Sequence, residues 1–174
     1  MQAQSGVGAQ VSWADLDEAP GGQVARLTSA RVIDEDGSTV DAVDVRRPVG
    51  IEMSFVVLKG GVALFPKIKI SNERGEIAFN ALDTSDRWRE PSAPGEYTAT
   101  AWIPGNLLNE GLMYVDVTVA SVGTAKLISH VNSVGVLAFH VQDPGEGDSA
   151  KGLYAGQLKG TVRPLLSWDS DRRS

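Results

Sequence analysis

Short apolar segments rich in Val and Ile recur from Val24 onward, roughly ten residues apart, with turn residues between them. Several of these segments alternate apolar with polar residues, as strands with one buried face do. Helical periodicity does not extend over any useful length. The sequence therefore predicts an all-β sandwich or barrel. The predicted strands span residues 24–33, 40–45, 50–58, 64–71, 76–82, 95–103, 112–121, 126–129 and 133–141.

Alternation along the strands assigns their side chains to two faces. The apolar face predicts the core, formed by Ile51, Met53, Phe55, Val57, Ile68, Ile70, Tyr97, Ala99, Ala101, Met113, Val115, Val117 and Val119. The opposite face carries Glu52, Ser54, Lys67, Lys69, Thr98, Thr100, Trp102, Tyr114, Asp116 and Thr118. This second set is polar except for Trp102 and Tyr114, so these two aromatic residues need a separate explanation.

The composition argues against several classes of function. With 42% hydrophobic and 22% charged residues, the 174-residue chain has the composition of a globular domain with one core. A net charge of −6 has the wrong sign for neutralising phosphates, which argues against nucleic acid as a partner. With no cysteine, two histidines and no glycine-rich phosphate loop, the sequence predicts no metal and no cofactor.

The two ends of the chain differ in composition from its centre. Residues 1–23 are rich in Gly and small polar residues, which predicts a flexible leader or interdomain linker before a domain at 24–168. Within that domain, residues 144–152 form a glycine-rich tether to a last apolar strand at 160–168, and residues 169–174 form a charged tail. A tethered terminal strand can pair with a neighbour's sheet, so we expect a homodimer formed by strand exchange.

The N-terminus has neither a basic region nor a long apolar run, and no segment approaches the roughly 18 apolar residues of a membrane span. We therefore expect a soluble chain that its own sequence does not export.

Residues 83–90 form the most suggestive predicted loop because Trp88 lies between Arg87 and Arg89. A guanidinium group can hold an anionic group while an indole stacks on a sugar ring, so these three residues are candidate carbohydrate contacts. In the alternative, Trp88 folds back to cover one end of the sandwich while the arginines stay in solvent.

Trp102 and Tyr114 form the second candidate site. Aromatic rings among hydroxyls and carboxylates suit sugars, because the C–H faces of a pyranose are apolar while its hydroxyls need hydrogen-bond partners. Alternation predicts that this candidate face carries Thr98, Thr100, Trp102, Tyr114, Asp116 and His140. In the alternative, a returning loop or a partner subunit covers the two aromatic rings.

A catalytic function is a third hypothesis. Paired carboxylates could serve a glycosidase, and the candidates are Glu73, Glu76, Asp83, Asp86 and Asp116. Acidic residues in and near turns more often provide solvation and turn hydrogen bonds. The sequence therefore predicts a protein that is not an enzyme.

Blocks of residues along the chain support a specific resemblance. They are VIDEDG at 32–37, an apolar strand at 51–57, FPKIKISNERGEIAFN at 65–80, PGEY at 94–97, IP at 103–104, LLNEGLMY at 107–114 and GTVRPLLSW at 160–168. Taken in order, they resemble the C-terminal domain of the Wzt-type ATP-binding subunits of O-antigen polysaccharide ABC exporters. The resemblance extends over about four fifths of the chain.

This resemblance implies an immunoglobulin-like antiparallel β-sandwich that dimerises by exchange of its last strand. It also implies binding of the modified non-reducing end of the O-antigen polysaccharide before export. The implied partners are a nucleotide-binding domain preceding Met1 in the parent protein and a membrane-spanning exporter subunit, at the cytoplasmic face of the bacterial inner membrane. Glycan contacts vary within the family, so the candidate residues rest on the face assignment. A β-sandwich that only mediates protein assembly is the alternative function.

Overall fold

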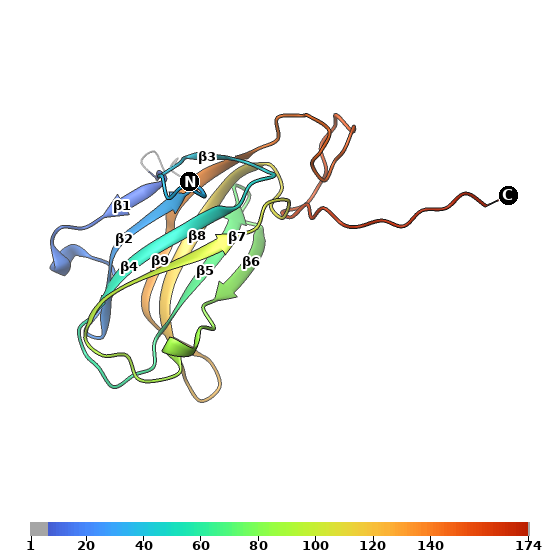
Figure 1. Ribbon diagram of the computed structural model, residues 1–174. Helices are drawn as coiled ribbons and strands as arrows, with labels where there is room; N and C mark the ends of the chain where they lie inside the picture. Colours follow the sequence, from blue (N-terminus) through green and yellow to red (C-terminus); the bar gives the residue numbers. More distant parts are fainter. Residues whose placement is uncertain (1–6, 174) are drawn as a thin grey trace.

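The computed structural model describes residues 7–173, and nine strands in this range form two sheets packed face to face (Figure 1). The strands are β1 (Gln10–Ser12), β2 (Ala25–Ile33), β3 (Ala42–Asp44), β4 (Val49–Val57), β5 (Phe65–Asn72), β6 (Ile77–Leu82), β7 (Gly95–Ile103), β8 (Gly111–Val122) and β9 (Leu127–Gln142). Two 3₁₀ turns, η1 (Leu16–Glu18) and η2 (Asp86–Trp88), are the helical elements of the described range. The predicted all-β sandwich is confirmed.

The strand order defines the two sheets. One sheet has four strands in the order β1-β2-β4-β7, and the other has five in the order β3-β9-β8-β5-β6. Neighbouring strands are antiparallel except for β3, which pairs in parallel with β9. On one side of the sandwich, the outermost strands β7 and β6 therefore end their respective sheets.

The core lies between the sheets and confirms the inward-facing set predicted from alternation. Burying a large apolar side chain contributes about 1.5–3 kcal/mol, so β4 and β8 supply much of the stabilising area. The buried predicted residues are Ile51, Met53, Phe55, Val57, Ile68, Ile70, Met113, Val115, Val117 and Val119. Tyr97, Ala99 and Ala101 of β7 are partly buried against them.

The N-terminal segment departs from the predicted flexible leader. Residues 10–12 form β1, which pairs with β2, and the Ala138 N–H of β9 donates to the Gly8 carbonyl at 2.9 Å. The Arg26 guanidinium donates to the carbonyls of Leu16, Asp17 and Ala19, which holds the following turn. Backbone pairing orders this segment despite its small apolar content. The first six residues of the predicted leader lie outside the described range.

The predicted strands 126–129 and 133–141 are one long strand, β9. Val115 of β8 lies opposite Leu137 and Val117 lies opposite Ser133, so residues 134–136 bulge opposite Asp116. Gly135 has a φ of 59°, in the region that favours glycine, and its N–H donates to Asp116 Oδ1 at 2.7 Å. The sequence indicated a break here because the bulge interrupts the alternation.

The C-terminal segment makes few backbone contacts with its own sandwich. Residues 160–168 form no strand within this chain and make one isolated antiparallel bridge, between Leu108 and Val162. Residues 144–152 lie against the sandwich rather than forming a free tether, and the charged end of the chain extends away from both sheets (Figure 1). Ser174 lies outside the described residues.

Candidate functional site

The predicted binding face is divided between two surfaces. Thr98, Thr100 and Trp102 lie on β7 of the four-stranded sheet, whereas Tyr114 and Asp116 lie on β8 of the five-stranded sheet. Each set points away from the core, so the two sets occupy opposite outer faces of the sandwich. The prediction of one shared face was wrong because alternation distinguishes inside from outside but not one sheet from the other.

Trp102 borders a groove on the side of the molecule where the outermost strands β7 and β6 end the sheets. The groove has a volume of about 270 Å³, and Trp102 is 50% exposed beside it. Its lining includes Met53, Lys67, Ile68, Leu82, Asp83, Thr84, Thr100 and Trp102. We call this feature the Trp102 groove. Thr98 lies outside its lining, with its hydroxyl 2.9 Å from that of Ser54.

The indole of Trp102 is positioned by Gly50, its partner across the β4–β7 pair. A Cβ atom added at Gly50 would lie 3.1 Å from Trp102 Cζ3 and 2.8 Å from Ile33 Cγ1. The missing side chain therefore lets the indole lie close to β4. The groove has an aromatic residue, Trp102, beside Thr84, Thr100 and Lys67, a lining that suits a small hydroxylated ligand, whereas the Asp83 carboxylate already accepts from Ser85 and Trp88.

The loop tryptophan, Trp88, is a core residue. Trp88 is 6% exposed and packs against Phe55 and Tyr97, with ring centroids 5.9 and 5.6 Å away. Its Nε1–H donates to Asp83 Oδ2 at 2.7 Å. Burial alone would raise the pKa of Asp83, but hydrogen bonds from Ser85 and Trp88 outweigh it and lower that pKa. The alternative in which Trp88 covers one end of the sandwich is therefore correct.

The two flanking arginines remain at the surface. The Arg87 guanidinium lies 5.8 Å from the Trp88 ring centroid, and Arg89 pairs with Asp86 at 3.2 Å. Both arginines belong to the η2 region rather than to the lining of the Trp102 groove.

Asp116, Tyr114 and His140 are arranged on the outer face of the five-stranded sheet. Asp116 is buried, and besides accepting the Gly135 N–H it pairs with Lys69 Nζ at 3.2 Å. Its carboxylate thus supports the bulge of β9. His140 is exposed on β9 opposite Leu112, two residues before Tyr114 on β8.

A larger cavity lies elsewhere, at the end of the five-stranded sheet. It has a volume of about 1280 Å³ and is lined by β3, the β5–β6 turn, the start of β8, the end of β9 and residues 157–160. We call it the end cleft. Sequence reasoning did not identify it because its walls come from segments far apart in the chain.

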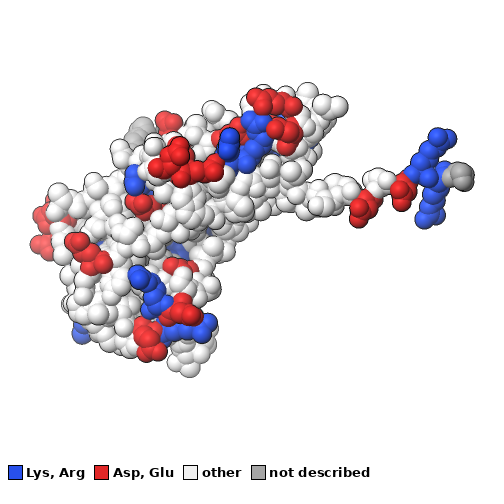
Figure 2. Space-filling model, in the orientation of Figure 1, with Lys and Arg blue, Asp and Glu red and all other residues white. Residues whose placement is uncertain are grey.

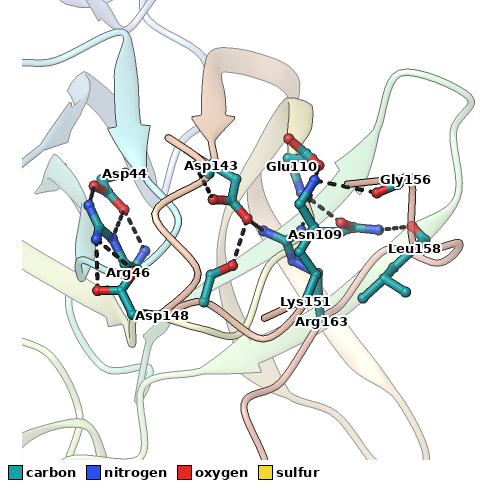
Figure 3. A network of polar contacts seen from close by, with 12 residues as sticks. Asp44, Arg46, Asn109, Glu110, Asp143, Asp148, Lys151, Gly156, Leu158 and Arg163 are labelled. Atoms are coloured by element: carbon teal, nitrogen blue, oxygen red, sulfur yellow. Dashed lines mark hydrogen bonds and ion pairs between the residues drawn. The ribbon is translucent and has the colours of Figure 1, made fainter. Parts of the chain in front are cut away.

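One wall of the end cleft is formed by residues 144–163, which we call the C-terminal strap. The Asn109 side-chain amide donates to the carbonyls of Leu158 and Gly160, both at 2.7 Å (Figure 3). Arg163, 3% exposed, donates to Asp143 Oδ2 at 2.9 Å. These contacts hold the strap across the end of the sandwich.

Two further cations attach the strap. Lys151 donates to Glu110 at 3.1 Å, and Arg46 pairs with Glu146 and Asp148 at 2.7 and 2.8 Å. Arg46 also donates to both carboxylate oxygens of Asp44, which lowers the pKa of that carboxyl to about 2. Ion pairs between oppositely charged side chains therefore connect the strap to the sandwich.

Two further kinds of feature, a metal-binding cluster and a membrane-spanning helix, are absent from the described residues. Residues 7–173 bring together no group of three or more His, Cys, Asp or Glu side chains that could hold a metal ion. No helix of this range has the length and apolarity that crossing a membrane requires.

Comparison with known proteins supports the fold. No protein-family model and no curated protein matches the sequence. A solved structure described as "Crystal structure of the C-terminal domain of wzt" matches with a TM-score of 0.67, covering 87% of this chain and 86% of that chain at 13% sequence identity. The chain therefore has the fold of the C-terminal domain of Wzt, as the order of its sequence blocks predicts.

Proposed function

We propose that this chain is a non-catalytic carbohydrate-binding domain that recognises an O-antigen polysaccharide through the Trp102 groove. The observation that carries the proposal is the half-exposed Trp102 beside a groove lined by hydroxyls, on a sandwich with the fold of the Wzt C-terminal domain. The resemblance of the sequence blocks adds that the bound part is the modified non-reducing terminus.

The size and chemistry of the groove fit one terminal sugar. Its volume of about 270 Å³ lies just below the roughly 300–1,000 Å³ of typical small-molecule pockets. The indole would stack on the C–H face of the ring, while Thr100 and Thr84 would pair with its hydroxyls. Lys67 would attract an anionic modification of that sugar.

The first test is the loss of the stacking surface. Removing a stacked aromatic costs on the order of 1–3 kcal/mol for nucleic-acid bases, so Trp102→Ala should weaken glycan binding about tenfold or more. Calorimetric titration should compare whole O-polysaccharide with the same polymer lacking its terminal residue. Tyr114→Ala, on the opposite outer face, is the matched control and should bind normally. Normal binding by Trp102→Ala would contradict the proposed site.

The proposed setting is an ABC exporter. In the parent protein, a nucleotide-binding domain would precede this domain and a membrane-spanning subunit would be its partner, at the cytoplasmic face of the inner membrane. The support for this setting is the ordered resemblance of the sequence blocks together with the shared fold.

We also propose a homodimer in which the end of the chain pairs with the partner's sheet. Leu165, Leu166 and Trp168 are 54%, 59% and 82% exposed. Large apolar side chains exposed so close together mark an interaction surface. Within the described range, the last backbone contact with the sandwich is the Leu165 N–H to the Asn106 carbonyl, and residues 166–173 follow it. A partner sheet would cover these side chains.

A further inference from the structure

The end cleft offers a second surface to the polysaccharide proposed above. It shares no lining residue with the Trp102 groove, and its volume of about 1280 Å³ exceeds the roughly 300–1,000 Å³ of pockets for single small molecules. Strand β5 connects the two features, because Lys67 borders the groove and Asn72 borders the cleft. Five residues of strand separate them by roughly 17 Å. One extended ligand could therefore reach both.

The charges around the cleft compensate one another. Each lining acid below has a cation beside it: Asp44 pairs with Arg46, Glu76 with Arg74, Glu110 with Lys151 and Asp143 with Arg163. The two remaining lining charges, on Glu73 and Lys159, are opposite in sign. Figure 2 shows acidic and basic side chains side by side near the strap end of the molecule. The lining itself has five acids and two bases, so an anionic sugar would meet no excess of positive charge.

The rest of the lining suits a neutral hydroxylated chain. Gln142 and Gln157 present exposed amides, which can donate to and accept from hydroxyls. Leu112, Leu158 and Pro144 supply apolar area between these polar groups. Hydroxyls beside apolar C–H faces are the chemistry of an uncharged sugar.

The cleft is also held open by its own contacts. The Asn109 amide fixes the strap at Leu158 and Gly160, and the buried Arg163–Asp143 pair fixes the next segment of the strap. A wall fixed before binding costs less conformational entropy when a ligand binds.

We infer that the end cleft binds an uncharged stretch of several sugars that follows the terminal residue held by Trp102. The inference rests on the proposed function. The domain would then recognise both the terminal residue of the glycan and the sugars next to it. Fragments that carry the terminal residue should then bind more tightly as they lengthen from one repeat unit to several.

The experiment is calorimetric titration of the full chain with such fragments of a neutral O-polysaccharide. For the wild type, affinity should rise about tenfold from the single repeat to the longer fragments. Gln142→Trp and Leu112→Trp, which fill the cleft from β9 and β8, should abolish this gain and leave the affinity for the single repeat unchanged. Asn132→Trp, at an exposed position of β9 outside the cleft, is the control and should keep the gain.

The outcomes separate the two proposals. A length-dependent gain that persists in both folded cleft variants would overturn the cleft as its source, while loss of binding in Trp102→Ala would still support the groove. A gain seen only with fragments that carry charged internal sugars would overturn the uncharged class. A wild-type chain that binds neither fragments nor polymer would overturn the proposed function itself.

Discussion

Two tryptophans show how the position of a residue in the sandwich decides its role. Trp88 is in a 3₁₀ turn that places its ring against Phe55 and Tyr97, whereas Trp102 is on the outer face of β7 above Gly50. Trp88 also has an internal partner for its N–H, the Asp83 carboxylate. The first residue therefore serves stability, and the second is free to serve binding.

We expect Trp88→Ala to destabilise the domain by about 3–5 kcal/mol, because truncating a large buried aromatic loses transfer free energy and leaves a cavity. Urea unfolding monitored by circular dichroism measures the change. Arg87→Ala is the neighbouring surface control and should change stability by no more than about 0.5 kcal/mol. A loss below about 1 kcal/mol for Trp88→Ala would mean that the ring does not close the core.

Asp116 is a polar residue that stabilises the pairing of two strands, β8 and β9. Its carboxylate accepts the buried Gly135 N–H at the bulge between β8 and β9. Asp116→Ala leaves that donor without its partner and should cost about 1–3 kcal/mol. Asp116→Asn keeps an acceptor oxygen and should cost less. Equal losses in the two variants, measured by urea unfolding, would refute the hydrogen bond as the cause.

The C-terminal strap depends on a buried ion pair. Arg163 and Asp143 are both almost fully buried side chains, and removing one partner of such a pair costs about 3–5 kcal/mol because the other charge stays desolvated. We expect Arg163→Ala to release residues 144–163, which hydrogen exchange would detect as lost protection. Lys159→Ala, at an exposed strap position, should leave protection unchanged. Wild-type protection in Arg163→Ala would contradict this role.

The same attachment should depend on pH. Hydrogen bonds from the Ser149 hydroxyl and the Gly145 N–H, together with Arg163, hold the pKa of Asp143 below its ordinary value. A carboxyl with a lowered pKa stabilises the folded state above the unfolded pKa of about 3.9, and this contribution is lost as the pH falls through the folded pKa.

Limited proteolysis should therefore cleave the strap faster as the pH falls below about 4, with an acid-active protease. Asp44 contributes in the same direction between about 4 and its folded pKa of about 2. The double variant Asp44→Asn, Asp143→Asn should cleave at nearly the same rate across this range once corrected for protease activity. An equally steep rise in that variant would assign the effect to other groups.

At the scale of the whole molecule, the exposed end of the chain predicts its assembly. Truncation after Arg163 removes Leu165, Leu166 and Trp168 but keeps the strap attached. We expect the intact chain to be a dimer and the truncated chain to be a monomer, as measured by light scattering after size-exclusion chromatography. A dimer that survives truncation would contradict strand exchange, and a monomeric intact chain would contradict the homodimer.

The sequence by itself determined the central strands, β2 and β4 to β8, and the inside of the sandwich. Alternation placed Ile51 and Met113 inward and Trp102 and Tyr114 outward, and the structure agrees. These features depend on steric preferences of neighbouring residues and on the two-residue period of a strand, both of which are local. The order of the sequence blocks carried the resemblance further, to the fold shared with the Wzt C-terminal domain.

Only the tertiary structure decided which outward residues meet. It assigned β7 and β8 to different sheets and so separated Trp102 from Tyr114. It also buried Trp88 and formed the end cleft from segments far apart in the chain. Strand pairing and burial depend on contacts between residues distant in sequence, and the alternation of residues along one strand does not predict those contacts.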